Sequence, residues 1–171
     1  MASELKNLSI YKETGIANQT ENTNYKIGIA VSEWNQEVTA NLAEAAIETL
    51  KKYGFAESDI VLKSVPGSFE LPLAAQYLVE IAETDAVICL GCVIQGETRH
   101  FDYVCSGVTK GIMEVNLDTG VPVAFGVLTT DNQQQALDRS GGKLGNKGVE
   151  AAVAALKMLF MKQELLNKGE K

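Results

Sequence analysis

The only histidine of the sequence, His100, lies in a stretch whose residue types could support proton transfer and anion binding. An apolar run, Ala86–Ile94, ends in the polar tetrapeptide Gln95-Gly-Glu-Thr98, and helical periodicity begins at Phe101. This pattern is typical of a buried strand, a tight loop and a helix start. Ligands bind at the carboxyl ends of parallel strands, and a helix N-terminus offers free N–H groups to anions. The pattern therefore favours a proton-transfer role for His100 as much as a purely structural one.

Arginine is the rarer basic residue, with Arg99 beside His100 and Arg139 before the glycine-rich segment Ser140–Gly148. A guanidinium binds phosphate in a planar, two-pronged way that an ammonium group does not. For Arg99 a surface ion pair is the simpler interpretation, whereas an anion site is at least as good an interpretation for Arg139. The glycine-rich segment lacks the spacing of a P-loop, and the segment after the apolar run lacks the dinucleotide fingerprint. The sequence thus disfavours nucleoside triphosphates and nicotinamide dinucleotides as ligands.

Three further side chains could line a ligand site, and each also has a structural explanation. Trp34, the single tryptophan, follows the first predicted strand, where an indole could stack on a flat ring or simply pack. Glu70 stands at a predicted helix start, where a carboxylate is a good cap. Phe125 lies within the last predicted strand and by default belongs to the core.

Two of the three cysteines, Cys89 and Cys92, have a spacing that could indicate a metal or redox pair. Both fall in the predicted strand Ala86–Ile94, where residues at this odd-numbered spacing face opposite sides of the sheet. Such a pair could neither grip one metal ion nor form a disulfide. We interpret them as small buried residues of a cytoplasmic protein.

Composition restricts the class of protein and its partners. The 171 residues, 46% hydrophobic and 22% charged, fit one globular domain. A formal net charge of −7 argues against nucleic acid and anionic membranes as partners. The sequence has no apolar run of the ~20 residues that a membrane span needs, and its N-terminus has neither a signal-peptide core nor the arginines of a transit peptide. We expect a cytoplasmic protein with residues 1–24 as a flexible arm and residues 25–171 as one domain.

Strand and helix patterns alternate from residue 25 onward, which predicts right-handed crossovers and a parallel sheet with helices on both faces. The expected fold is a three-layer α/β/α sandwich, flavodoxin-like, with a central four-stranded parallel sheet. Leu8–Tyr11 could add an edge strand, on this or another subunit. Asn35 is expected to cap the first helix, and Thr129–Asp131 to form a loop. The predicted strands are 25–31, 59–65, 86–94 and 121–128, and the predicted helices are 36–53, 69–81, 101–117, 132–139 and 149–166.

Three segments together resemble the 6,7-dimethyl-8-ribityllumazine synthase family of riboflavin biosynthesis. They are Val65–Pro72 (VPGSFELP), Gly91–Val104 (GCVIQGETRHFDYV), and Gly126–Asp131 (GVLTTD) with Arg139 and Gly145–Gly148 (GNKG). The resemblance covers the chain from about Tyr25 to the last helix. It implies a transferase that condenses 5-amino-6-(D-ribitylamino)uracil with 3,4-dihydroxy-2-butanone 4-phosphate through an imine, releasing phosphate and water. It implies no metal ion and no organic cofactor.

The resemblance also implies roles for individual residues. Trp34 would stack on the pyrimidine ring, and His100 would transfer protons. Glu97 and Thr98 would form a phosphate loop with Arg139, and Lys147 is a further candidate for contact with the ligands. The other uracil-binding residues would be Ser68, Phe69 and Glu70 as lining side chains, Cys92, Val93 and Ile94 through their main chain, and Phe125, which like Arg139 would come from the neighbouring subunit. The family often has Phe in place of Trp34, and Ala in place of Ser68 or Glu97.

The same resemblance implies an assembly. The family forms pentamers, and a short loop of the Gly-x-Lys-x-Gly-Asn type goes with icosahedral shells of pentamers, which we expect here because the loop carries no insertion. Riboflavin synthase is a candidate partner of such a shell. Two alternatives stay open. A catalytically silent lumazine- or flavin-binding protein on the same fold would have lost His100 or the phosphate-binding arginine, and a flavodoxin-like response or carrier domain would need a carboxylate cluster after the first strand.

Overall fold

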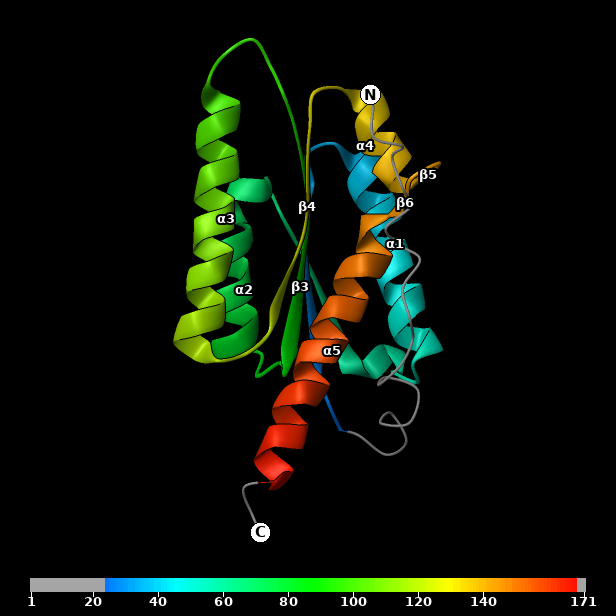
Figure 1. Ribbon diagram of the computed structural model, residues 1–171, viewed down its shortest axis with the longest axis vertical. Coiled ribbons are helices and arrows are strands. Elements are labelled where there is room, and N and C mark those ends of the chain that lie inside the picture. The colour runs from blue at the N-terminus through cyan, green and yellow to red at the C-terminus, as the bar shows by residue number, and fades with distance from the viewer. Residues whose placement is uncertain (1–23, 169–171) are drawn as a thin grey trace, which may run out of the picture.

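The computed structural model describes residues 24–168, and its centre is a four-stranded parallel sheet. In sequence order the strands are β1 (Ile27–Ser32), β2 (Ile60–Val65), β3 (Ala86–Ile94) and β4 (Val123–Thr130). Their order in space is β2-β1-β3-β4, and every neighbouring pair is parallel (Figure 1). The predicted central sheet is confirmed, and β3 has the bounds predicted for it.

Helices cover both faces of this sheet, as Figure 1 shows. The pair α1 (Gln36–Lys52) and α5 (Lys147–Lys168) packs on one face, and the pair α2 (Leu71–Glu80) and α3 (His100–Thr119) packs on the other. A short helix, α4 (Gln133–Arg139), follows β4, and Asn132 caps it by accepting a hydrogen bond from the Gln135 N–H at 3.0 Å. The predicted three-layer fold is therefore confirmed, and it explains why β3 is apolar on both of its faces.

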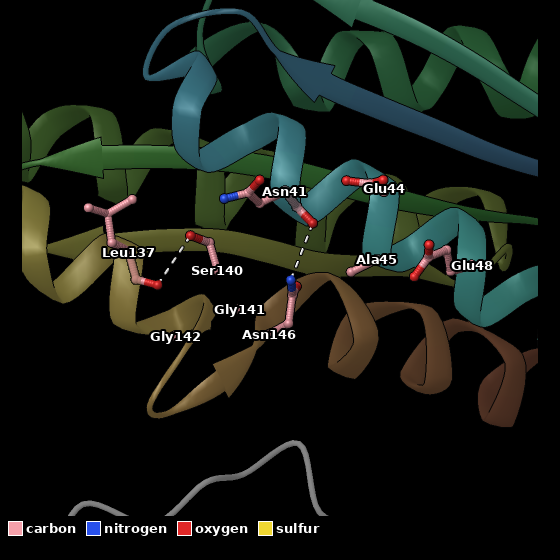
Figure 2. Close-up of a pocket in the computed structure, with 9 residues that line it drawn as sticks. All are labelled: Asn41, Glu44, Ala45, Glu48, Leu137, Ser140, Gly141, Gly142 and Asn146. Atoms are coloured by element: carbon pink, nitrogen blue, oxygen red, sulfur yellow. Dashed lines mark hydrogen bonds between the residues drawn. The ribbon is translucent and has the colours of Figure 1, made fainter.

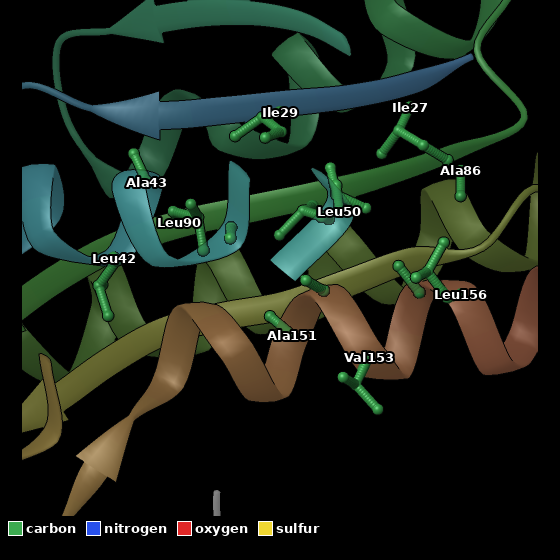
Figure 3. Packing of buried hydrophobic residues seen from close by; sticks show 14 of the residues in the cluster. Ile27, Ile29, Leu42, Ala43, Leu50, Ala86, Leu90, Ala151, Val153 and Leu156 are labelled. Atoms are coloured by element: carbon green, nitrogen blue, oxygen red, sulfur yellow. The ribbon is translucent and has the colours of Figure 1, made fainter. Parts of the chain in front are cut away.

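The larger part of the core lies between the sheet and helices α1 and α5 (Figure 3). Ile27 and Ile29 of β1 lie in one cluster with Leu42 and Leu50 of α1 and Leu156 of α5, and each of these side chains is 0% exposed. Burying one such side chain stabilises the fold by about 1.5–3 kcal/mol. This cluster fixes α1 and α5 against the sheet. It thereby also positions the loops that connect these two helices to the rest of the chain.

The cysteines of β3 face opposite sides of the sheet, as predicted. Cys89 packs into the cluster beneath α2 and α3, whereas Cys92 belongs to the cluster beneath α1 and α5. Burial raises the pKa of the Cys89 thiol to about 12 and that of the Cys92 thiol to about 11. Both thiols therefore stay protonated at neutral pH, which fits buried packing residues and not a metal or redox pair.

The start of α1 departs from the prediction for Asn35. This residue does occupy the N-cap position, but its backbone is left-handed (φ 59°, ψ 45°) and its side chain does not cap the helix. Instead, Asn35 Nδ2 donates a hydrogen bond to the Cys92 carbonyl at 2.9 Å. The predicted side-chain cap was wrong because the backbone of Asn35 is left-handed where a capping residue is usually extended, and the bond from Nδ2 orients the amide toward the end of β3.

Other boundaries also differ from the prediction. A 3₁₀ turn, η1 (Glu57–Asp59), precedes β2, and another, η2 (Ser68–Glu70), precedes α2, so the helix predicted from Phe69 is two elements. Thr129 and Thr130 do not form a loop, because they extend β4 and pair with the last residues of β3. The glycine-rich segment contains a small antiparallel hairpin, β5 (Ser140–Gly142) and β6 (Gly145–Asn146).

Two sequence-based expectations concern regions and properties beyond this sheet. The expected edge strand Leu8–Tyr11 lies outside the described residues, as does nearly all of the expected N-terminal arm. No helix between residues 24 and 168 combines the length and the apolar character that crossing a membrane requires.

Candidate active site

A cavity of about 400 Å³ opens at the carboxyl ends of β1 and β3. This volume suits a small organic molecule. The residues predicted from sequence that line it are Trp34, Ser68, Phe69, Glu70, Cys92, Val93, Ile94 and His100. Segments far apart in the chain thus converge where ligands of parallel sheets are expected to bind.

Trp34 lies against the loop that follows β2. A Cβ on Gly67 would come within 2.6 Å of the Trp34 ring, and the Trp34 N–H donates to the Pro66 carbonyl at 3.2 Å. The side chain is nevertheless 65% exposed. The indole is therefore held in place by this loop while keeping aromatic surface free, which suits stacking on a planar ligand.

Two glycines make room for the next lining residues. A Cβ on Gly107 of α3 would lie 2.6 Å from the Phe69 ring, and a Cβ on Gly91 of β3 would lie 2.5 Å from Ser68 Oγ. Phe69 is 59% exposed, whereas Ser68 is only 5% exposed. Between residues 24 and 168, Ser68 Oγ finds no hydrogen-bond partner. A buried hydroxyl without a partner is destabilising, so this side of the cavity carries an unsatisfied polar group.

Glu70 serves as a cap and also lines the cavity. Its Oε2 accepts a hydrogen bond from the Gly67 N–H at 3.0 Å, which closes η2 in the way expected of a carboxylate at a helix start. The same residue is part of the cavity wall. The structural and the ligand-binding interpretation of Glu70 are thus compatible.

His100 is the first residue of α3, and it is exposed where it lines the cavity. Its N–H donates to Thr98 Oγ1 at 3.4 Å, and the Gln95 N–H ties the preceding loop to the Thr130 carbonyl at 2.8 Å. Glu97 and Thr98 are exposed in this loop and are not among the residues that line the cavity. Because the N-terminal end of a helix dipole favours negative charge, the loop beside His100 suits an anion.

Three residues that line the cavity were missed in the sequence: Asn35, Tyr103 and Val104. Tyr103 and Val104 follow His100 at the helical spacing that places side chains on the same face, so this signal was present. Asn35 had no such signal, because its amide reaches a carbonyl that is 57 positions away in the sequence.

Phe125, Arg139 and Lys147 do not line this cavity in a single chain. Phe125 lies on β4, at the edge of the described sheet, and packs half-buried against the cluster beneath α2 and α3. The default assignment of Phe125 to the core is therefore only partly right.

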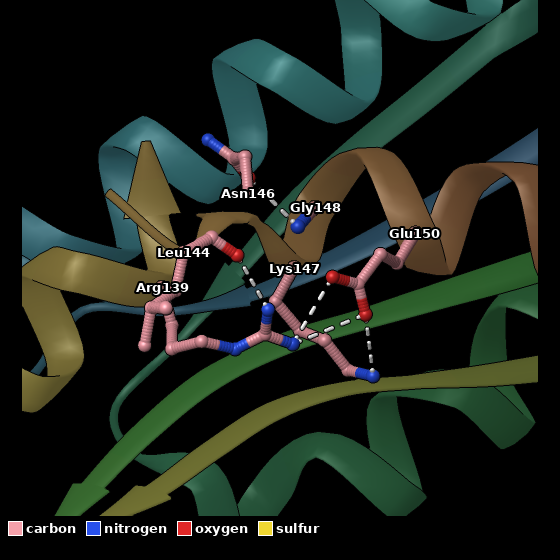
Figure 4. A network of polar contacts seen from close by, with 6 residues as sticks. All are labelled: Arg139, Leu144, Asn146, Lys147, Gly148 and Glu150. Atoms are coloured by element: carbon pink, nitrogen blue, oxygen red, sulfur yellow. Dashed lines mark hydrogen bonds and ion pairs between the residues drawn. The ribbon is translucent and has the colours of Figure 1, made fainter. Parts of the chain in front are cut away.

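Arg139 and Lys147 meet in a separate ionic group, which we call the Arg139 cluster (Figure 4). Arg139 Nη1 donates to the Leu144 carbonyl at 2.7 Å, and Nη2 contacts Glu150 Oε1 at 3.0 Å and Oε2 at 3.2 Å. Lys147 Nζ contacts Glu150 Oε2 at 3.1 Å. The side chains are 19% exposed for Arg139, 29% for Lys147 and 12% for Glu150. Arg139 is thus held in a partly buried ion pair at the end of α4.

The β5–β6 hairpin beside this cluster docks on α1 and leaves a polar hollow of about 480 Å³ (Figure 2). Asn146 Nδ2 donates to the Asn41 carbonyl at 3.2 Å, and a Cβ on Gly148 would lie 2.0 Å from the Leu42 carbonyl oxygen. Gly145 has a φ of 87°, a conformation that favours glycine. The glycines of this segment therefore allow a tight hairpin and close packing of α5 on α1, in agreement with the absence of a P-loop motif.

A model of the 6,7-dimethyl-8-ribityllumazine synthase family matches residues 24–163. The chain belongs to this family. It is 56% identical over 160 residues to the 6,7-dimethyl-8-ribityllumazine synthase of Cytophaga hutchinsonii, covering 93% of this chain and 98% of that relative. The relative of the same name in Parabacteroides distasonis is 54% identical over 159 residues, with 93% and 98% covered. That of Phocaeicola vulgatus is 47% identical over 165 residues, with 96% of each chain covered.

Membership of the lumazine synthase family confirms the resemblance that the sequence indicated. The segments that carried this resemblance supply His100 and other residues of the cavity, and Arg139 and Lys147 of the Arg139 cluster. In the part of the chain from residue 24 to residue 168, no group of three or more His, Cys, Asp and Glu side chains could hold a metal ion.

Proposed function

We propose that this protein condenses 5-amino-6-(D-ribitylamino)uracil with 3,4-dihydroxy-2-butanone 4-phosphate to 6,7-dimethyl-8-ribityllumazine, releasing phosphate and water. This is the penultimate step of riboflavin biosynthesis. The observation that carries the proposal is the convergence of Trp34, Phe69 and His100 on one cavity, in a chain of the lumazine synthase family.

The uracil substrate has a planar, polar ring and a flexible ribityl chain. We propose that the ring stacks on Trp34, and that main-chain groups of Cys92, Val93 and Ile94 bind its polar edge at the end of β3. Ser68, Phe69 and Glu70 would line the space for the ring and the ribityl chain. Exposed aromatic surface beside a few fixed polar groups is the usual composition of a small-molecule site, which supports this placement.

The phosphorylated ketone must lose its phosphate after the uracil amine has formed an imine with its carbonyl. Breaking the carbon–oxygen bond transfers negative charge to the phosphate, so fixed donors at that position lower the barrier. We propose that Thr98 and the positive end of the α3 dipole stabilise this charge, and that Arg139 adds a guanidinium. His100, at the same helix start, would move the protons that imine formation and ring closure require. The Glu97 carboxylate would point away from the phosphate.

We further propose that adjacent subunits share each site. Phe125, Arg139 and Lys147 have roles in the family pattern, yet they do not line the cavity of their own chain. A head-to-tail ring would bring these residues of one subunit to the cavity of the next. Pentameric rings, assembled into an icosahedral shell, are the assembly that we propose, since the segment Gly141–Asn146 is short and carries no insertion.

An activity assay with the purified protein tests this function. The two substrates are mixed with the protein, and lumazine formation and phosphate release are followed together. We expect both products in equal amounts, and the uncatalysed reaction is subtracted with a sample that lacks protein. A protein that binds the lumazine product but does not accelerate its formation would be the catalytically silent alternative.

A further inference from the structure

Glu150 is a charged residue that neither the sequence pattern nor the proposed chemistry uses. It lies in the first turn of α5, at i+3 from Lys147, so both side chains occupy the same face of the helix. Its carboxylate contacts Arg139 Nη2 through both oxygens and Lys147 Nζ through Oε2 (Figure 4). Only 12% of the side chain is exposed, so the carboxylate lies mostly out of solvent between two cations.

These contacts determine the orientation of the Arg139 guanidinium. Glu150 holds Nη2, while the Leu144 carbonyl holds Nη1 at 2.7 Å from the other end of the group. Because both terminal nitrogens are held, the planar guanidinium is restrained from turning about the bonds of the arginine side chain. The guanidinium still has more N–H donors than these bonds use, so it can bind an anion without leaving its place.

The charges of the cluster also favour an anion. Arg139 and Lys147 carry one positive charge each and Glu150 one negative charge, so the group keeps a net positive charge. Without Glu150, two neighbouring cations would repel each other, and the long arginine side chain would sample many rotamers. A phosphate would then have to order the side chain on binding, which weakens affinity.

We propose that Glu150 is a positioning residue that fixes Arg139 for the phosphate of the ketone substrate, with Lys147 as its second counter-ion. This inference rests on the proposed function, because it concerns the same phosphate site. Glu150 acts through Arg139 and does not itself contact the phosphate. Its removal should therefore affect the phosphorylated substrate and leave the uracil substrate almost unaffected.

Steady-state kinetics of Glu150→Ala and Glu150→Gln test this role. For Glu150→Ala we expect the KM for the phosphorylated ketone, and the inhibition constant for inorganic phosphate, to rise on the order of tenfold, as expected for a misplaced binding group. In Glu150→Gln the amide oxygen can still accept from Arg139, so a rise of about threefold is expected, because a neutral acceptor is weaker than a charged one. The KM for the uracil should change by less than about twofold in both variants, since its site is not altered.

Lys143→Ala is the matched control, because it also removes an ion pair from the hairpin region. Lys143 Nζ contacts Asp138 Oδ2 at 3.0 Å, and its side chain is 70% exposed, so this ion pair lies on the surface and not in the Arg139 cluster. We expect wild-type KM values for this variant. Light scattering and thermal melting verify that each variant folds and assembles. If Glu150→Ala fails to fold, the kinetics of Glu150→Gln alone test the positioning role.

The outcomes separate the inference from the function on which it rests. An unchanged or lower KM for the ketone in both Glu150 variants would overturn the positioning role, and so would an equal rise for both substrates. If the wild-type protein forms no lumazine, the proposed function fails instead. Calorimetric titration of wild type and Glu150→Gln with inorganic phosphate still reports whether Glu150 supports anion binding, and equal affinities would count against it.

Discussion

The cavity at His100 and the Arg139 cluster differ in how far a single chain completes them. In the cavity, Trp34 and Phe69 keep more than half of their surface exposed, at 65% and 59%, and the Ser68 hydroxyl has no partner within the described chain. In the Arg139 cluster, Arg139 and Lys147 share the Glu150 carboxylate as their counter-ion, and only 12–29% of each side chain is exposed. One region is open and partly unsatisfied, and the other is ordered and electrically paired.

This contrast follows from the cost of burying different groups. Exposed aromatic surface costs little, and stacking a ligand on it is favourable, so it can remain uncovered until substrate binds. A partly buried charge without a counter-ion is far more costly, so a cationic phosphate site needs a built-in carboxylate before any substrate arrives. The proposed enzyme would thus bind one substrate to an open surface and the other to a group oriented in advance.

The largest effect is expected when His100 and Arg139 are altered in different subunits of one assembly. His100→Ala should slow turnover about 10²-fold, at the low end for an acid–base group, and Arg139→Ala should remove the phosphate clamp. When the two variants are co-expressed, roughly a quarter of the interfaces in a random head-to-tail ring pair an intact His100 with an intact Arg139. We expect a corresponding recovery of activity. Mixed assemblies that stay as inactive as either parent would place both residues in the site of one chain.

The position of α5, which carries Lys147 and Glu150, should depend on the close packing of Gly148 against α1. A Cβ there would lie 2.0 Å from the Leu42 carbonyl oxygen, so Gly148→Ala should lower the free energy of unfolding by about 3 kcal/mol, as severe overpacking does. Denaturant unfolding measures the loss. Gly96→Ala is the control, since a Cβ at Gly96 meets nothing within 4 Å, and a change within about 0.5 kcal/mol is expected. Equal stability of both variants would show that α5 can shift away from α1.

A milder change should distinguish the substrates. Arg139→Lys keeps the positive charge but replaces a planar two-pronged donor with a point charge. The KM for the phosphorylated ketone should rise about tenfold, which corresponds to one weakened hydrogen bond to a charged group, and the KM for the uracil should rise much less. Competition by inorganic phosphate gives an independent reading. Equal effects on both substrates would contradict the assignment of Arg139 to the phosphate.

The smallest effect is expected in the cavity. Ser68→Ala removes a buried hydroxyl that lacks a partner between residues 24 and 168, so the free energy of unfolding should increase by about 1 kcal/mol. Thermal melting of the ligand-free protein measures it, with Ser106→Ala on the outer side of α3 as a control. A less stable Ser68→Ala protein would indicate that this hydroxyl is satisfied in the assembled protein and that the cavity is as complete as the Arg139 cluster.

Much of the fold and of the cavity could be predicted because local sequence determines them. The continuous apolar run Ala86–Ile94 can hardly be anything other than a strand covered on both faces, and its bounds were predicted correctly. Trp34 and His100 follow strands of one parallel sheet, whose carboxyl ends must share an edge. These residues are positioned by the order of elements, which hydrophobic periodicity reveals.

The contacts that could not be predicted depend on tertiary partners. Asn35 is a residue type that often caps helices. Its side-chain amide instead donates to the Cys92 carbonyl, 57 residues away, because folding brings that carbonyl within reach. Glu150 stands at helical spacing from Lys147, yet nothing in the sequence indicates that the same carboxylate also binds Arg139. A polar side chain with several candidate acceptors takes the one that the packed structure presents, and this choice is invisible before the fold is known.

The bond between Asn35 and Cys92 has a consequence for the ageing of the protein. Deamidation would turn the Asn35 amide, now a donor 2.9 Å from the Cys92 carbonyl, into a carboxylate that can only accept. Two acceptors would then face each other at the wall of the cavity, with a new negative charge beside the end of β3. One spontaneous chemical event, without any change of gene, would remove the hydrogen bond between the start of α1 and the end of β3, while the buried cluster still holds α1 against the sheet. Old molecules would lose the shape of the cavity while their core stayed folded.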